Sequence, residues 1–130
     1  MQPDGEASMW LEFARADLEV AAEHGHVNRW VVGIRCYHCQ QAAEKALKAV
    51  IDHYGGDVPH FHNLVDLMQI ASSTNDLPDG ASEWRTLNAY IVATRYPDAL
   101  HEATDDDLAE ALELARAVVA WATSVIETAT

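Results

Sequence analysis

The sequence predicts an all-α domain, an up-and-down bundle of four main helices with one additional short helix. Apolar residues recur at spacings of three and four over most of the chain, which is the spacing of one face of an α-helix. No segment combines strict apolar–polar alternation with β-branched residues, the pattern typical of a strand. The prolines after the first all fall in segments expected to be loops.

The first helix is expected to begin at Ser8, a residue type that caps helix N-termini, and to end at 24–26. The second helix is the longest, over 30–54, and two glycines at 55–56 end it. A short third helix starts near Asn63.

The fourth helix is predicted over 82–94, with Trp84, Leu87 and Ile91 on one side, and the turn at 95–98 breaks it. The fifth opens at Thr104, and Asp107 three residues later nearly completes a capping box. Its apolar stripe is Leu108, Ala111, Leu112, Ala115, Val118, Val119, Ala122 and Ile126.

Length and charge limit the function. The 130 residues suit one domain, 1–130, and the formal net charge is −13, from 21 acidic residues against 8 lysines and arginines. Such a surface repels nucleic acid, so RNA binding would need a local basic patch or one assembled across a dimer. The sequence has no apolar run long enough for a transmembrane helix and no signal peptide pattern at its start, so we expect a cytoplasmic protein without membrane contact.

The second helix has two contrasting faces. One is an expected core face of Val32, Cys36, Cys39, Ala43, Ala46, Leu47, Val50 and Tyr54. Roughly opposite lie Arg35, His38, Gln41, Lys45 and Lys48. Three interpretations of this polar face are open: a solvated surface with pairs such as Glu44–Lys48, an anion- or partner-binding strip, or a homodimer interface.

Two other motifs give weaker indications of chemistry. Cys36 and Cys39 have the spacing of a redox pair, but they fall inside a helix, where thiols are more often part of the core. His60 and His62 form an H-x-H without an obvious third zinc ligand. No P-loop, dinucleotide-binding or zinc-protease motif is present, so we expect no metal and no cofactor.

The sequence QQAAEKALKA at 40–49, with the residues 36–39 before it, resembles the most recognisable segment of small prokaryotic HEPN proteins. Three further pieces agree in order and spacing: ADL at 16–18 after Trp10, HNL at 62–64, and RYPD at 95–98. The resemblance covers nearly the whole chain.

The resemblance implies a helical bundle, a homodimer, and pairing with a minimal nucleotidyltransferase in a toxin–antitoxin system. In such pairs the HEPN protein is typically the toxin and the nucleotidyltransferase the antitoxin, which in some systems adenylylates a tyrosine of the HEPN protein. Tyr96, Tyr90 and Tyr37 are the candidates here. The candidate nucleotide- or RNA-binding residues combine the polar face of the second helix with two further side chains: Arg35, His38, Gln41, Lys45, Lys48, His62 and Tyr96.

Catalytic HEPN ribonucleases carry an arginine followed a few residues later by a histidine, a spacing that Arg95 and His101 fit. The resemblance implies metal-independent RNA cleavage at a site shared by two copies. His101 would act as general acid or base, and Arg95 would bind the scissile phosphate. Alternatively, Arg95 caps the C-terminus of the fourth helix and His101 is a surface residue.

Three functions are therefore open. The chain is a ribonuclease toxin, a non-catalytic module that binds a nucleotide or positions substrate for the nucleotidyltransferase, or a bundle that mainly assembles with partners.

Overall fold

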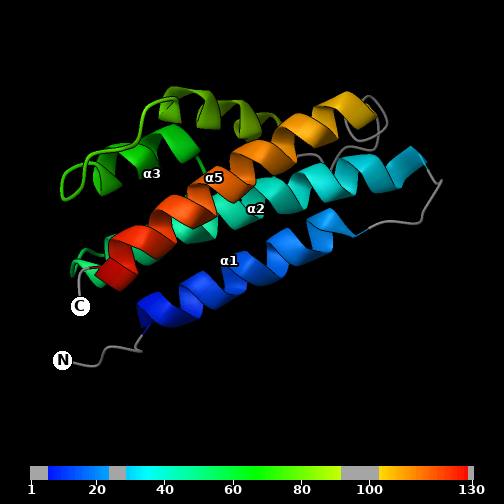
Figure 1. The fold of residues 1–130 in the computed structure, drawn as a ribbon. Helices are drawn as coiled ribbons and strands as arrows, with labels where there is room; N and C mark the ends of the chain where they lie inside the picture. The colour runs from blue at the N-terminus through cyan, green and yellow to red at the C-terminus, as the bar shows by residue number, and fades with distance from the viewer. Residues whose placement is uncertain (1–5, 24–28, 92–102, 129–130) are drawn as a thin grey trace.

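The computed structural model describes residues 6–23, 29–91 and 103–128, and every regular element among them is a helix. The elements are α1 (Glu6–Ala22), α2 (Arg29–His53), α3 (Leu64–Ala71), the 3-10 helix η1 (Ala81–Tyr90) and α5 (Asp105–Thr128). The main helices α1, α2, η1 and α5 run in alternating directions, and the short α3 lies beside η1 (Figure 1). The predicted all-α bundle with an additional short helix is confirmed.

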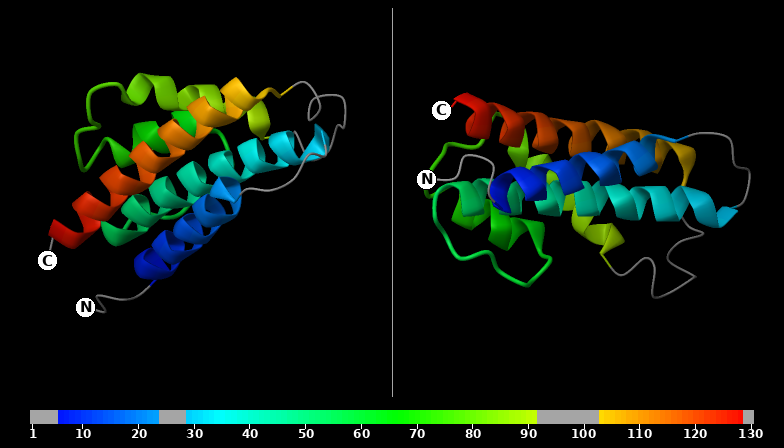
Figure 2. Two further views of the ribbon diagram at one scale, coloured as in Figure 1. Left: turned by 45° about the vertical axis from the view of Figure 1, so that its right-hand side comes forward. Right: turned by 90° about the horizontal axis from the view of Figure 1, so that it is seen from below.

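Helix α2 is the centre of the bundle. Among the described helices it contacts all of the others, whereas α1 contacts neither α3 nor η1. The views in Figure 2 place α1 on one side of α2 and the layer formed by α3 and η1 on the other. Close approach from several sides is possible because Ala42, Ala43, Ala46 and Ala49 are all fully buried and have small side chains.

Element η1 differs from the α-helix predicted over 82–94. Its buried residues Ala81, Trp84 and Leu87 are three apart, which is one turn of a 3-10 helix, so they lie directly above one another. The same spacing puts Tyr90, rather than Ile91, next on the face that packs against the core. Residues 92–94 lie outside the described part of the chain.

The ends of α2, α3 and α5 agree with the predicted capping residues. The start of α1 does not, because the helix begins at Glu6 and Ser8 lies inside it. Gly55 has a φ of 80°, and the N–H of Gly56 donates to the carbonyl of Ile51 at 3.0 Å, which terminates α2. The Asn63 side chain accepts from the N–H of Val65 at 2.9 Å and so caps α3.

No described helix is both long enough and apolar enough to cross a membrane.

A reciprocal capping box opens α5. The hydroxyl of Thr104 accepts from the N–H of Asp107 at 3.1 Å, and the Asp107 carboxylate accepts from the N–H of Thr104 at 2.9 Å. Asp105, Asp106 and Asp107 also place negative charge at the positive end of the helix dipole.

We expect Thr104→Ala to lower the free energy of unfolding by about 1 kcal/mol, because the N–H of Asp107 loses its acceptor. Thr104→Ser keeps the hydroxyl and serves as the control. Urea denaturation of the three proteins tests this, and equal midpoints for wild type and Thr104→Ala would show that the box contributes nothing.

Candidate functional site

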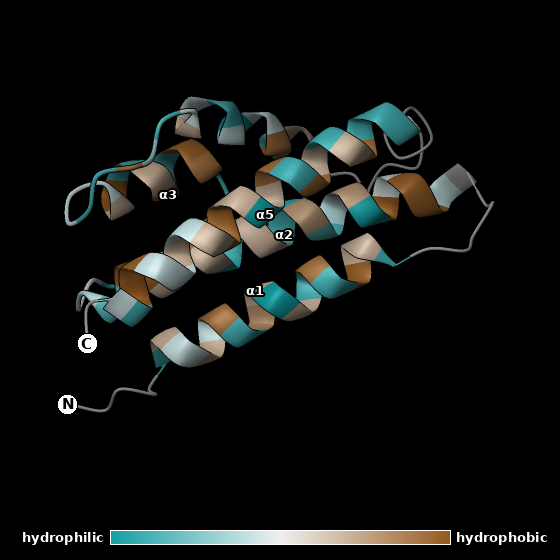
Figure 3. Cartoon of the chain, viewed as in Figure 1, coloured by the Kyte–Doolittle hydropathy of each residue, from teal (hydrophilic) through white to brown (hydrophobic). Residues whose placement is uncertain are grey.

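The middle of α2 contains a buried group of polar side chains. Gln40, Glu44, Lys45 and Lys48 are buried there, and Asp17 of α1 is buried opposite them. Figure 3 shows hydrophilic residues interspersed with apolar ones along α1 and α2. Among the described residues, every buried side-chain nitrogen and oxygen atom has a hydrogen-bond partner. The group is therefore a satisfied network in the interior of the bundle.

Asp17 joins α1 to α2 through an ion pair with Lys45 and a hydrogen bond with His38. Its carboxylate accepts from Lys45 Nζ at 2.5 Å and lies 2.9 Å from His38 Nδ1. Burial by itself would raise the pKa of Asp17, but the hydrogen bonds of His38 and Lys45 and the charge of Lys45 outweigh it, and the pKa lies below its usual value of 3.8. The ionised carboxylate of Asp17 thus stabilises the fold at pH values above its usual pKa. This contribution is lost as the pH falls through the lowered pKa.

Glu44 is the centre of a second cluster, which joins α2 to His62. Lys48 Nζ donates to its carboxylate at 3.0 Å, and His62 Nδ1 lies 3.0 Å from the same oxygen. Gln40 Nε2 donates to Glu44 at 3.1 Å and to the main-chain carbonyl of His62 at 3.3 Å. Gln41 adds a bond to the carbonyl oxygen of the Gln40 side chain at 2.7 Å. The cluster ties the chain ahead of α3 to α2.

Aromatic rings of α1 cover the two lysines. Lys45 Nζ lies 3.4 Å from the centroid of the Phe13 ring, and Lys48 Nζ lies 5.6 Å from that of Trp10. Such contacts stabilise a cation that is removed from water. Arg35 has a different partner, because its Nε donates to the main-chain carbonyl of Ala21 at 2.7 Å in the last turn of α1.

The interpretation of this α2 face as a solvated surface is wrong. Lys45 and Lys48 are only 8% and 5% exposed, because α1 packs over them. The predicted pair Glu44–Lys48 does form, but inside the bundle. Tyr54, expected in the core, is instead exposed. The binding role assigned to Arg35, His38, Gln41, Lys45 and Lys48 stays a prediction.

Three members of the network were missing from the predicted site: Asp17, Gln40 and Glu44, the last of which was predicted only as the partner of Lys48. The first had a detectable pattern, since Asp17 follows Ala14 by three residues and precedes Ala21 by four, and both alanines are buried. An acid at a core-facing position of an amphipathic helix indicates a buried partner of opposite charge. Gln40 had no comparable pattern.

Among the predicted binding residues that the structure describes, His62 has the most accessible side chain. Its imidazole is 53% exposed, although Nδ1 is held by the buried Glu44. An ionised carboxylate at Nδ1 favours the proton on that nitrogen, which leaves Nε2 as an acceptor. The pair can therefore present a fixed imidazole to a ligand at the surface. The corresponding ring of His38, on Asp17, is 28% exposed.

The cysteines are part of the core. Cys36 and Cys39 are both free and fully buried. Burial raises the pKa of Cys36 to about 11 and that of Cys39 to about 12, so both thiols stay protonated at neutral pH. The interpretation as core residues is confirmed. Within the described part of the chain, no three His, Cys, Asp or Glu side chains are grouped so as to hold a metal ion.

The predicted catalytic residues Arg95 and His101, and the neighbouring Tyr96, lie outside the described residues. The described chain resumes at Ala103, directly before the capping box of α5, and it stops at Ile91, directly after η1. Both points lie at the end of the bundle where α2 begins (Figure 2).

The fold and network define a small all-helical domain organised around a polar central helix. Residues 7–125 match the model of the HEPN domain, and the chain therefore belongs to the HEPN family. The protein TT1696 from Thermus thermophilus, known from a crystal structure, is similar at 31% sequence identity and a TM-score of 0.76. The likeness covers 92% of this chain and 98% of that one. No curated protein matches the chain. Membership supports a module associated with nucleotides or RNA.

The Asp17–Lys45 pair provides a test of the network. We expect Lys45→Met to lower the free energy of unfolding by about 3–5 kcal/mol, because it leaves the Asp17 carboxylate buried with one partner fewer. The double variant Asp17→Asn/Lys45→Met removes both charges and should recover part of that loss. Chemical denaturation of wild type, both single variants and the double variant measures the coupling. Strictly additive losses would mean that the pair does not act as a unit.

Proposed function

We propose that this protein is the HEPN component of a cytoplasmic HEPN–nucleotidyltransferase pair of toxin–antitoxin type, and that it acts as a metal-independent ribonuclease. The observation that carries the proposal is the family match over 7–125, which spans both Arg95 and His101. The network adds support, because Lys45 and Lys48 are paired with carboxylates and are not free to bind phosphate. Arg35 is also engaged, since its Nε donates to the carbonyl of Ala21, and we therefore assign phosphate binding to Arg95.

The proposed reaction needs only these side chains. As the ribose 2′-oxygen attacks the phosphorus, its proton passes to a histidine, and the bond to the 5′-oxygen breaks as that oxygen gains a proton. The products are a 2′,3′-cyclic phosphate and a 5′-hydroxyl. In the proposed site His101 moves the proton and Arg95 stabilises the charge that develops on the phosphoryl oxygens.

A second function, a non-catalytic module that binds a nucleotide, is favoured by one observation. His62 combines an exposed ring with a buried carboxylate at Nδ1, which is the geometry of a positioned hydrogen-bonding group. The net charge of −13 also disfavours tight binding of long RNA more than binding of a single nucleotide.

The homodimer is supported by the outer face of α1. Met9, Phe13 and Val20 are exposed by 66%, 53% and 45%, and their spacing of four and seven places them along one side of the helix. A contiguous exposed apolar face of this kind is typical of a contact surface.

Labelled RNA distinguishes the two functions. With chelator present, we expect cleavage by wild type and a loss of at least about a hundredfold in His101→Ala, the usual contribution of a general acid or base. His60→Ala, which removes an exposed histidine elsewhere, is the matched control and should cleave normally.

Failure of folded wild-type protein to cleave RNA, or equal cleavage by His101→Ala, would contradict the ribonuclease proposal. Binding of labelled ATP by wild type that is weakened in His62→Gln would then support the second function.

The dimer has its own test. We expect wild type to sediment as a dimer and Met9→Glu to shift toward monomer, since the new charge would be buried in the contact. Glu12→Gln on the same helix is the control. A wild-type monomer at high micromolar concentration would exclude this face as a homodimer contact.

A further inference from the structure

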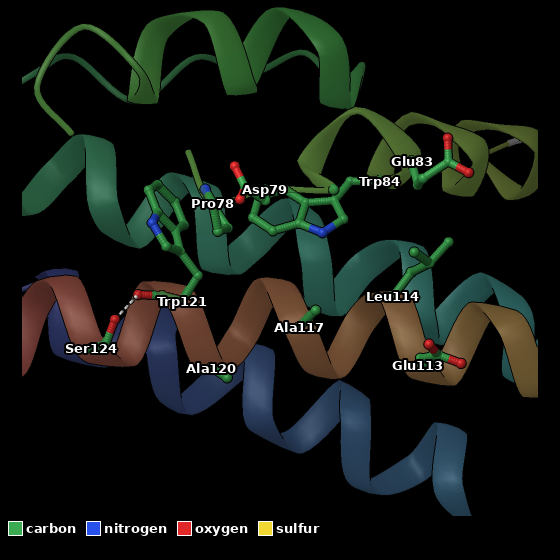
Figure 4. Close-up of a pocket in the computed structure, with 11 residues that line it drawn as sticks. Pro78, Asp79, Glu83, Trp84, Glu113, Leu114, Ala117, Ala120, Trp121 and Ser124 are labelled. Atoms are coloured by element: carbon green, nitrogen blue, oxygen red, sulfur yellow. Dashed lines mark hydrogen bonds between the residues drawn. The ribbon is translucent and has the colours of Figure 1, made fainter. Parts of the chain in front are cut away.

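A groove between η1 and α5, on the side of α2 away from α1, is not part of the polar network. Its volume is about 590 Å³, and it is lined by Pro78, Asp79, Gly80, Glu83, Trp84, Glu113, Leu114, Ala117, Ala120, Trp121 and Ser124 (Figure 4). It is open because residues 117 and 120 of α5, which lie beneath it, are alanines. The lining contains no lysine and no arginine.

Two tryptophans form the aromatic part of the groove. Trp84 of η1 is buried and Trp121 of α5 is partly exposed, and their ring centroids are 5.8 Å apart at an interplanar angle of 54°. Because Trp84 is only 2% exposed, the partly exposed Trp121 ring and its aliphatic neighbours provide the surface for alkyl chains and, through the negative ring face, for cations.

Carboxylates lie at separate places along the same groove. Asp79 precedes η1, whereas Glu83 and Glu113 lie well to the side of Trp121 in the close-up (Figure 4). A second hollow of about 230 Å³ shares Glu83, Glu113 and Leu114 and adds Thr86 and Glu110. The groove thus continues from an aromatic part into an acidic part.

The groove carboxylates have exposed side chains, and within the described residues no lysine or arginine forms an ion pair with them. By contrast, Asp17 and Glu44 in the bundle interior are each paired with a lysine. The negative charge in the groove is therefore available to a ligand, and the field of the protein as a whole favours a cation there.

We propose that this groove binds a flexible aliphatic polyamine. The separated carboxylates would accept hydrogen bonds from two ammonium groups, and the alkyl chain between them would lie against Trp121, Leu114 and Ala117. One ammonium group would approach the face of Trp121. A compact metal ion could not use the aromatic and alkyl surface, which is why an extended organic cation fits better.

Spermidine titrated into the purified full chain tests the proposal, with heat and tryptophan fluorescence as readouts at low salt. We expect saturable binding by wild type and an affinity about five- to tenfold weaker in Glu83→Gln/Glu113→Gln, the effect of removing two exposed charge pairs. Both glutamates are exposed, so the variant should fold.

The matched control is Glu12→Gln/Glu19→Gln, which changes net charge equally but lies on α1 outside the groove. Control affinity should equal that of wild type. Trp121→Phe should weaken binding as well, because indole is the stronger cation partner.

Three results would overturn the proposal: no saturable binding of spermidine, equal weakening in both double variants, or displacement of spermidine by an equal concentration of MgCl₂. The second and third would show that the attraction comes from surface charge alone. RNA cleavage by His101 does not enter these measurements, so the ribonuclease proposal stands or fails separately.

Discussion

The fold depends on satisfying the polar side chains buried in the middle of α2. A helix with partners on several sides is usually apolar all round, but this one carries Gln40, Glu44, Lys45 and Lys48 into the interior. Each buried charge must be paired, because an isolated one would cost several kcal/mol. Asp17 fixes the position of α1, and the bond between Glu44 and His62 fixes the chain entering α3. The network thereby specifies which surfaces of α2 its neighbours meet.

The sequence predicted the helices better than the surroundings of α2. Capping residues such as Asn63, Thr104 and Gly55 act through local hydrogen bonds, so their roles follow from a few neighbouring positions. The polar face of α2 was ambiguous because helical periodicity shows which residues share a face but not what covers that face. Coverage depended on Asp17, which is 28 positions away from its partner Lys45. The 3-10 form of η1 was equally hidden, since the apolar residues at 84, 87 and 91 have the spacing of an α-helix.

The same network engages most of the described cations that were assigned to binding. Among the residues assigned to binding, Arg35 closes the end of α1, and both lysines neutralise interior carboxylates. These three side chains therefore cannot stabilise the fold through their present contacts and bind phosphate at the same time. His62 can serve both purposes, because Glu44 contacts only one of its ring nitrogens and about half of the ring is exposed to solvent.

Charge is distributed unevenly between the two sides of the bundle. On the α1 side, acidic groups of the network are matched by lysines and covered with aromatic rings. On the η1 side, Glu83, Glu110 and Glu113 lie beside an aromatic groove without such matching among the described residues. Repulsion between these carboxylates opposes folding, and a bound cation would relieve it. Ligand binding to the groove should therefore stabilise the packing of η1 on α5.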